Sequence, residues 1–420
     1  MKLPFWLRSL LFFIAFVCVY IPLDILLVHG FASEVPLIEH VIDEQDTFDI
    51  AVMGSSHAYC GYDPRILNEA LVDSHTENLS IAALSFEHIS LLLKDMIAEE
   101  KQPEVLVLEM YSFRQPPNAH TQTVFFNGYS KTWRPDTLVQ LFSDYPSKEW
   151  IYTLFPLIYQ HDNWKNNDLL NRNLDNFWKK DTLTIREIVY TRGLFDNGFR
   201  PNPLVISDQE FSQAVSNPVN ITLETSNVKS FERILEMSSE NEIELIFIIA
   251  PYPEGFHADY SAMEEIEEKY GITIHNFNEK AAAYKQLQFL DDDHLNQYGA
   301  IQASLELAAI IAEETGRELA NENITRFQHL MLSDIMIENI DTSIQLTLIP
   351  ELPQKEPWDV EWVIFDEEGN QWDIQTVQSL SFSFPSALAY TQGLKLQVTY
   401  QQAGLDYPAK VIFNLVDLLD

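Results

Sequence analysis

The stretch FDIAVMGSSHAYCGYD, residues 48–63, decides how this chain folds. Its first part, residues 48–54, is apolar enough to form a buried strand, and a Ser-Ser-His tripeptide follows directly after Gly54. A buried strand that ends in a polar turn typically begins an α/β unit, and such loops often carry functional groups. The tripeptide is therefore either part of a site or only a polar turn.

The residues that follow continue the same pattern. In chain order, the sequence predicts a helix, a strand, a helix and a strand at 64–72, 76–84, 86–101 and 103–113. Pro64 occupies the favoured first position of the first helix, and the last strand is a continuous apolar run typical of a parallel strand covered on both faces. This βαβαβ beginning predicts a three-layer, doubly wound parallel sheet of the flavodoxin-like kind.

The α/β pattern is interrupted and then returns. Residues 115–215, rich in Trp, Asn, Phe and Tyr, predict an insertion of helices and loops. Helices and strands alternate again up to a long helix at 298–316, so we expect one α/β domain over 31–325. Beyond it, residues 326–420 contain short strands separated by turn residues, which predict a small β-sandwich domain.

The N-terminus predicts a membrane anchor over residues 1–30. An apolar run, from about Leu10 to Val28, is long enough to span a bilayer. Lys2 and Arg8 precede it, whereas acidic residues follow it. Because positive residues stay on the cytoplasmic side, we expect a single-pass protein whose N-terminus is cytoplasmic and whose body lies outside the membrane.

Composition restricts the function further. The 420 residues carry a formal net charge of −37, so binding to the phosphate backbone of a nucleic acid is not expected. Cys18 and Cys60 are the two cysteines, and Cys18 lies within the apolar run, so neither a disulfide framework nor a zinc cluster of cysteines is expected. Cys60 is either a free thiol near the site or a small buried filler.

Two distant segments together predict a catalytic triad. Ser56 follows the first strand, and Asp291 lies three residues before His294 in the run FLDDDHLNQYGA. A serine hydroxyl becomes a nucleophile when a histidine takes its proton and a carboxylate orients that histidine. Loops at the carboxyl ends of parallel strands meet at one edge of the sheet, so we expect these three side chains to lie together.

Over about residues 45 to 316 the chain resembles the SGNH (GDSL-like) hydrolase superfamily. It is most similar to the membrane-anchored branch of DltD-type proteins of teichoic-acid D-alanylation and AlgJ/AlgX-type O-acetyltransferases of exopolysaccharides. The resemblance implies Ser56 as nucleophile, His294 as general base and acid, and Asp291 as the carboxylate that orients it. The conserved sequence blocks from which this family builds its oxyanion hole match this chain less well.

The resemblance implies that backbone N–H groups of Ser56 and near Ala83 form the oxyanion hole. Asn78 matches the asparagine of the family's second block, and Ala83 stands where a glycine is usual. The third block, Gly-x-Asn-Asp, is missing, and Glu109 lies near its place. Losing one oxyanion donor typically costs about 100- to 1000-fold in turnover. This favours slow transfer to a bound sugar over fast ester hydrolysis.

Three functions remain open at this point. The first is an extracytoplasmic acyltransferase, most plausibly an acetyltransferase, that modifies a cell-envelope glycan and works with a multispanning membrane acyltransferase. The second is a carbohydrate esterase or lipase, and the third is a glycan-binding scaffold with a vestigial site. None of them calls for a cofactor or a metal.

Smaller features also have two interpretations each. His57 either makes a structural hydrogen bond or takes part in catalysis. Asp292 and Asp293, next to Asp291, form either a cation site or a solvated acidic turn. The aromatic insertion is either a lid or a surface on which a sugar ring stacks, and the β domain either binds carbohydrate or serves as a spacer.

Overall fold

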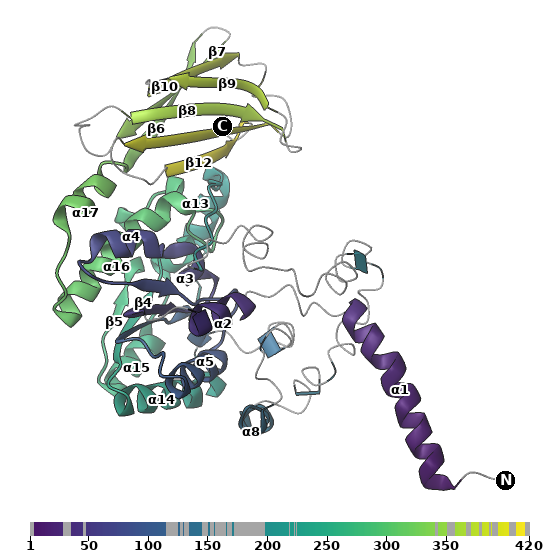
Figure 1. Ribbon diagram of the computed structural model, residues 1–420. Coiled ribbons are helices and arrows are strands. Elements are labelled where there is room, and N and C mark those ends of the chain that lie inside the picture. The colour runs from purple at the N-terminus through teal and green to yellow at the C-terminus, as the bar shows by residue number, and fades with distance from the viewer. Residues whose placement is uncertain are drawn as a thin grey trace.

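In the computed structural model, the described residues form an N-terminal helix, an α/β body and a β domain (Figure 1). Between 125 and 171 only short pieces are described, of which 134–144 is the longest. The described ranges are 4–27, 35–44, 48–114, 198–217, 225–340, 343–350, 358–366, 371–377, 380–385, 394–402 and 409–415, with residue 388 and short pieces at 125–171 and 219–223. Most of the predicted insertion, 115–215, therefore lies outside the described residues.

The body contains a five-stranded parallel sheet in the order β2-β1-β3-β4-β5. Its strands are β1 (Ile50–Met53), β2 (Thr76–Asn78), β3 (Val105–Glu109), β4 (Glu244–Ile249) and β5 (Ile274–Asn276). This is the flavodoxin-like order of a doubly wound sheet. After β2 is added on one side of β1, the later strands are added on the other side, so the strand order switches between β1 and β3. The α/β class predicted from the sequence is confirmed.

Alternate residues of the strands face two separate cores. Ala51 and Met53 pack in one core with α2 (Val35–Glu44), α5 (Phe86–Ala98), α14 (Thr225–Glu240) and α15 (Ser261–Tyr270). Ile50 and Val52 pack in the other with α3 (Ser56–Gly61), α4 (Pro64–Ala70) and α16 (Gln297–Thr315). Both faces of the sheet are thus covered, which explains why its strands are apolar throughout.

Shorter elements complete the body. They are α6 (Tyr111–Arg114), α8 (Pro135–Asp144), α13 (Asp208–Ser216), α17 (Asn321–Gln328) and the 3₁₀ helices η2 (Pro253–His257), η3 (Phe277–Ala283) and η4 (Gln286–Gln288). Described residues between 125 and 140 of the insertion contact α5. Tyr129 donates a hydrogen bond to Asp95, and Phe125 stacks on His88 at a ring separation of 4.2 Å.

Two antiparallel sheets form the C-terminal part. One has the order β10-β7-β6 and the other β12-β11-β8-β9. Their bounds are β6 (Leu332–Ile340), β7 (Ser343–Pro350), β8 (Trp358–Phe365), β9 (Gln371–Val377), β10 (Ser381–Pro385), β11 (Lys395–Gln402) and β12 (Ala409–Asn414). Residues of both sheets share one core, in which Trp362 stacks on Phe382 at 5.3 Å. This packing is that of a small β-sandwich.

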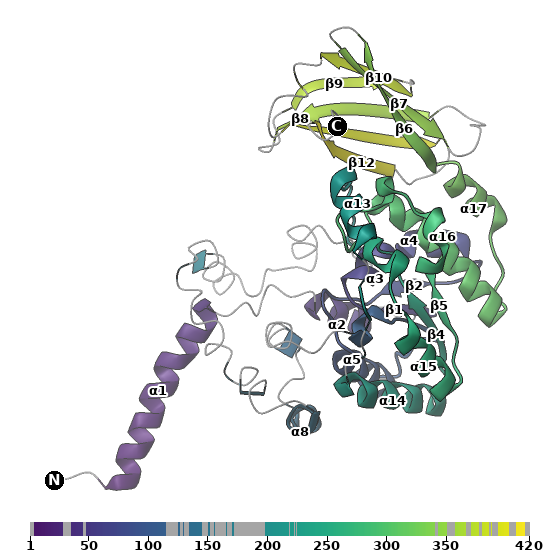
Figure 2. The same cartoon turned by 180° about the vertical axis from the view of Figure 1, so that it is seen from behind.

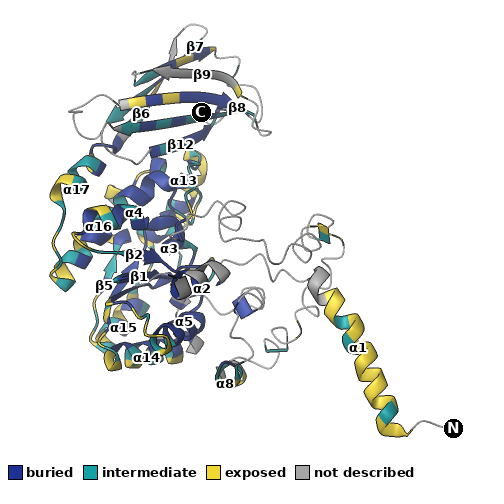
Figure 3. Ribbon diagram, in the orientation of Figure 1, coloured by how far each residue is buried: buried dark blue, intermediate teal, exposed yellow. Residues whose placement is uncertain are grey.

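The β domain is attached to the body through backbone and side-chain contacts. Val205 and Ile412 are joined by a backbone hydrogen bond of 3.0 Å, and the hydroxyl of Tyr298 in α16 donates to the carbonyl of Leu332 at 2.9 Å. Tyr298 is also part of the core of the β domain. Figure 3 shows that buried residues continue from α16 into strand β12 above it.

Helix α1 (Phe5–Leu27) stands apart from the body in both views (Figures 1 and 2). Its apolar segment Phe5–Leu23 is long and apolar enough to cross a membrane, and none of it is buried against the protein. A signal sequence near the N-terminus can pass the same test of length and composition.

Candidate active site

Ser56 lies at the carboxyl end of β1, in the first turn of α3. Ser55 is the N-cap of this helix, and its Oγ accepts a hydrogen bond from the N–H of His57 at 3.4 Å. The turn is therefore held by a normal helix-capping interaction. Because the strand order reverses between β1 and β3, Ser56 lies where doubly wound sheets usually bind their ligands.

The buried carboxylate of Glu109, at the end of β3, holds this turn through hydrogen bonds. Its side chain is fully buried, with Oε2 accepting the hydroxyl of Ser55 at 3.1 Å and Oε1 accepting the N–H of Tyr111 at 2.8 Å. Burial raises the pKa of Glu109, although the nearby His57 opposes the shift. A Cβ at Gly54 would lie 2.5 Å from the Cβ of Glu109, so no larger residue fits there.

His294 and Asp291 lie on a tight turn before α16. Phe289 and Leu295 pair across the base of the turn as an isolated bridge, and the N–H of Leu290 donates to the carbonyl of His294 at 2.9 Å. Asp291 Oδ1 accepts the backbone N–H of His294 at 2.7 Å. The carboxylate therefore holds the shape of the turn as well as the histidine ring.

The structure brings Ser56, His294 and Asp291 together. Nε2 of His294 lies 2.7 Å from Oγ of Ser56, and Nδ1 lies 3.0 Å from Oδ1 of Asp291. When Nδ1 donates to the carboxylate, Nε2 is left as the acceptor for the serine hydroxyl. This is the arrangement of a nucleophile, a base and an orienting carboxylate.

The charges of the turn favour the imidazolium form of His294. Burial acts to lower the pKa of His294, but the hydrogen bond that its ring donates to Asp291 and the negative charges of Asp291 and Asp293 outweigh it and raise this pKa. Burial would also raise the pKa of Asp291, yet its hydrogen bonds to His294 and to the backbone hold it below the ordinary value. The pair is thus prepared to accept a proton.

The two oxyanion-hole candidates outside α3 have different environments. Asn78 is buried, and its amide nitrogen donates to the carbonyls of Ala58 at 3.0 Å and Tyr62 at 2.8 Å. Both amide hydrogens are therefore used to hold α3, and the side chain is not free to donate to a substrate. Asn78 positions the nucleophile helix instead.

Ala83 belongs to a loop held beside the Gly54 turn. The N–H of Ile81 donates to the carbonyl of Gly54 at 3.2 Å, and Ala83 has a φ of 55°. This left-handed conformation costs an alanine about 1–2 kcal/mol and suits the glycine that the resemblance implies there. Ala83 therefore adopts a conformation that a glycine would adopt without this cost.

The sequence pattern around His294 also has a packing reason. Oδ1 of Asn296 caps α16 by accepting the N–H of Gly299 at 2.9 Å. A Cβ at Gly299 would lie 2.2 Å from the carbonyl oxygen of Gln288, so the helix approaches this backbone too closely for any side chain. Asn296 and Gly299 thus place the turn that carries His294.

We expect Gly299→Ala to destabilise the protein by about 1–3 kcal/mol or more, because the clash is with backbone. Gly61→Ala is the matched control, since its Cβ would meet Leu295 at an ordinary 3.5 Å. Urea unfolding of both variants measures the difference. If the two variants have equal free energies of unfolding, the backbone of η4 moves to make room for the added methyl group.

Cys60, one turn after Ser56, is a free and buried cysteine. Burial raises the pKa of its thiol to about 12. The residue is therefore a small core filler and not a reactive thiol.

A pocket of about 370 Å³ adjoins the triad through Asp291. Its polar lining consists of carboxylates and carboxamides, which hydrogen-bond to hydroxyl groups. The lining residues are Ile206, Glu210, Gln213, Ala214, Asn217, Glu254, Asp291 and Asp292. Its position makes it a candidate binding site for a substrate of Ser56.

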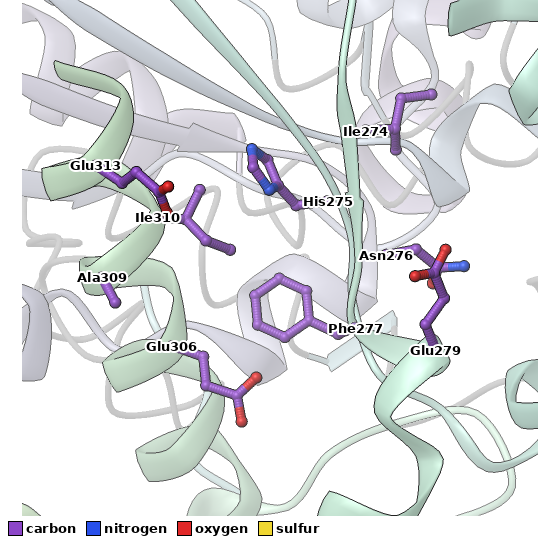
Figure 4. A pocket seen from close by; sticks show the side chains of 9 residues that line it. All are labelled: Ile274, His275, Asn276, Phe277, Glu279, Glu306, Ala309, Ile310 and Glu313. Carbon is purple, nitrogen blue, oxygen red and sulfur yellow. The ribbon is translucent and has the colours of Figure 1, made fainter.

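A second pocket, of about 390 Å³, lies between β5 and α16 (Figure 4). The side chains of His275 and Phe277 project toward α16, where Glu306 and Ile310 face them. No residue of the triad lines this pocket. It is therefore separate from the candidate active site.

Sequence reasoning missed a second group of side chains at the site. Tyr111 stacks on His57 with ring centroids 3.6 Å apart, and Tyr252 meets the same ring edge-on at 5.1 Å. The hydroxyl of Tyr111 donates to Asp293 at 3.2 Å. The apolar run that contains Tyr111 gave no signal for this contact in the sequence. The contact depends on the loop before α16, which is distant in the chain.

No protein-family model and no curated protein matches this chain. Among solved structures, the endo-β-1,4-mannanase from Thermotoga petrophila aligns over 91% of this chain and 94% of its own length. The identity is 8% and the TM-score is 0.14, so this similarity carries no argument about fold or function.

Proposed function

We propose that this protein is a membrane-anchored, extracytoplasmic acyltransferase of the SGNH-like class that modifies a cell-envelope glycan. The observation that carries the proposal is the hydrogen-bonded chain from Ser56 through His294 to Asp291, with distances of 2.7 and 3.0 Å. The five-stranded order of the sheet and the left-handed Ala83 agree with the same class.

The chemistry follows from these contacts. His294 takes the proton of Ser56 as Oγ attacks the acyl carbon of the donor, and it then protonates the leaving group. A sugar hydroxyl next attacks the acyl-serine while His294 takes its proton; His294 then gives this proton to Oγ of Ser56 as the bond from Oγ to the acyl carbon breaks, which leaves the acylated sugar and free Ser56. The N–H groups of Ser56 and Ala83, which have no acceptor within the described parts of the chain, are available to stabilise the oxyanion.

The environment of the triad supports a sugar as acceptor. The adjoining pocket presents side chains such as Gln213, Asn217 and Glu254. These groups suit a polyhydroxylated ring, whereas an acidic substrate would meet like charge there. A multispanning membrane acyltransferase is the proposed source of the acyl group.

Covalent labelling with a fluorophosphonate tests the proposal directly. Because only neutral His294 can accept the proton of Ser56, and its pKa is raised, the labelling rate should rise with pH through a midpoint above 6.5. The full chain in detergent micelles is labelled over a pH series, and mass spectrometry identifies the modified residue. Absence of labelling at every pH would contradict the enzymatic function and favour a glycan-binding scaffold.

The topology makes a separate prediction. If residues of α1 cross the membrane with Lys2 and Arg8 on the cytoplasmic side, a protease added to cells whose inner membrane is intact should digest the β domain. Immunoblotting for a C-terminal tag measures the digestion. Complete protection would reverse the proposed orientation, and a soluble product that lacks α1 would identify a cleaved signal sequence.

A further inference from the structure

A second histidine–aspartate pair lies beside the triad. Nε2 of His57 is 3.0 Å from Oδ1 of Asp293, and the ring centroids of His57 and His294 are 5.2 Å apart. His57 follows Ser56 in α3, whereas Asp293 precedes His294 in the turn before α16. The pair therefore connects the same two segments as the triad.

The ring of His57 is only partly satisfied by its surroundings. Its side chain is only 1% exposed; Nε2 lies 3.0 Å from Oδ1 of Asp293 without the alignment of a hydrogen bond, and Nδ1 has no partner among the described residues. A buried polar group without a partner costs about 1–3 kcal/mol. Such a group at the edge of a site is a sign that a ligand completes its environment.

The surrounding atoms match the ligands of a transition metal. His57, Asp293 and His294 each offer one ligand atom, and these atoms all lie within 4.8 Å of one another. Two imidazoles and a carboxylate are a common zinc set, and three protein ligands leave a fourth position open. Nδ1 of His294 is bonded to Asp291, so Nε2 is its ligand atom.

The groups behind these ligands are also those of a metal site. Asp291 accepts a hydrogen bond from His294, and the hydroxyl of Tyr111 donates to Asp293 at 3.2 Å. Hydrogen bonds of this kind orient the ligands of bound zinc. The neighbouring carboxylate of Asp291 adds negative potential that attracts a cation.

We propose that His57, Asp293 and His294 form a binding site for Zn²⁺ or a similar divalent transition metal, and that the metal competes with Ser56 for Nε2 of His294. Nε2 has one lone pair, which either accepts the hydrogen of Ser56 or binds the metal. The metal-bound protein therefore has an inactive nucleophile, and a chelator restores it. This site goes beyond the acyltransferase function, and binding of the metal does not depend on that function.

Calorimetric titration of Zn²⁺ into the full chain in detergent micelles, after removal of metals with a chelator, tests the site. We expect one zinc ion per chain, with affinity reduced at least about 100-fold in His57→Gln and Asp293→Asn, since loss of even an outer hydrogen bond costs about 10- to 100-fold. Asp292→Asn is the matched control, because it removes the same charge from an exposed neighbour. It should bind zinc as the wild type does.

Fluorophosphonate labelling gives a second readout. Zinc should slow labelling of Ser56 in the wild type and in Asp292→Asn, EDTA should restore it, and Asp293→Asn should be much less sensitive. If His57→Gln fails to fold, Asp293→Asn decides alone, because its side chain is partly exposed. No measurable zinc binding, or binding unchanged in Asp293→Asn, would overturn the site.

The outcomes separate the two proposals. Zinc binding that depends on Asp293 supports the metal site even when Ser56 never labels, in which case the proposed acyl-transfer function fails alone. Labelling that zinc does not slow, in a chain that does not bind zinc, supports the acyl-transfer function and overturns the metal site.

Discussion

Replacing Ser56 with alanine should reduce turnover of a model ester such as p-nitrophenyl acetate by about 10⁴-fold or more, to the background rate. Loss of a triad nucleophile has effects of this size because histidine and carboxylate then have no group to activate. In cells that carry Ser56→Ala, acylation of the envelope glycan, measured by mass spectrometry, should disappear. The protein should remain folded, since Ser56 is not the helix cap.

Ser55→Ala is the matched control, because it removes the adjacent hydroxyl and keeps the nucleophile. Its hydroxyl caps α3 and donates to Glu109 at 3.1 Å, so we expect a loss of about 1 kcal/mol in stability. The variant should still label with a fluorophosphonate at Ser56. If Ser55→Ala loses labelling and Ser56→Ala keeps it, the roles of the two serines are exchanged.

The same variants distinguish acyl transfer from free hydrolysis. The resemblance implies a side-chain amide donor from the third block, which this chain lacks, so we expect slow hydrolysis by the wild type. Fast ester turnover together with unchanged glycan acylation in Ser56→Ala cells would favour an esterase. If neither assay responds to the substitution, the protein is a scaffold.

Asp291→Asn should have the second largest effect, a fall of about 100- to 10,000-fold in turnover. The amide cannot stabilise the imidazolium and favours the wrong tautomer of His294. Its oxygen still accepts the backbone N–H groups of Asp293 and His294, which now lie at 2.9 and 2.7 Å, so the turn should keep its shape. Loss of the negative charge should also lower the midpoint of the pH–rate profile.

Asp292→Asn tests whether position or general charge causes this effect. Asp292 carries the same charge one residue away, but it is exposed and makes none of the hydrogen bonds described for Asp291. We expect turnover of p-nitrophenyl acetate close to that of the wild type, because this ester carries no sugar to contact the pocket that Asp292 lines. An equal loss of turnover in both variants would show that the total negative charge of the turn matters, and not the position of Asp291.

The sequence predicted the α/β class because the strands after residue 48 are apolar on both faces, and only a sheet covered by two layers of helices buries such strands. It also predicted that Ser56, Asp291 and His294 lie together, because turns at the carboxyl ends of parallel strands meet at one edge, and the three side chains are in contact. The apolar run from about Leu10 to Val28 predicted a span by length and composition alone, and the structure has a helix whose segment Phe5–Leu23 is long and apolar enough for one. These features depend on local pattern and on topology, which the sequence expresses directly.

Other features depend on contacts between distant segments. Asn78 matched an oxyanion-hole block, yet its amide hydrogens are donated to carbonyls at Ala58 and Tyr62. Glu109 had no assigned role, but it holds the hydroxyl of Ser55 from a neighbouring strand. The close packing of the folded chain determines which polar groups lie within hydrogen-bonding distance of each other. Residue type alone does not determine this.

The environment of His57 was decided in the same way by tertiary structure. The sequence left it as a structural or a catalytic residue, whereas folding stacks it on Tyr111 and places Asp293 3.0 Å from its Nε2. Segments more than two hundred residues apart meet there because parallel strands bring their carboxyl ends to one edge. The sequence by itself determined which groups arrive at that edge, and only the packed fold decided which of them touch.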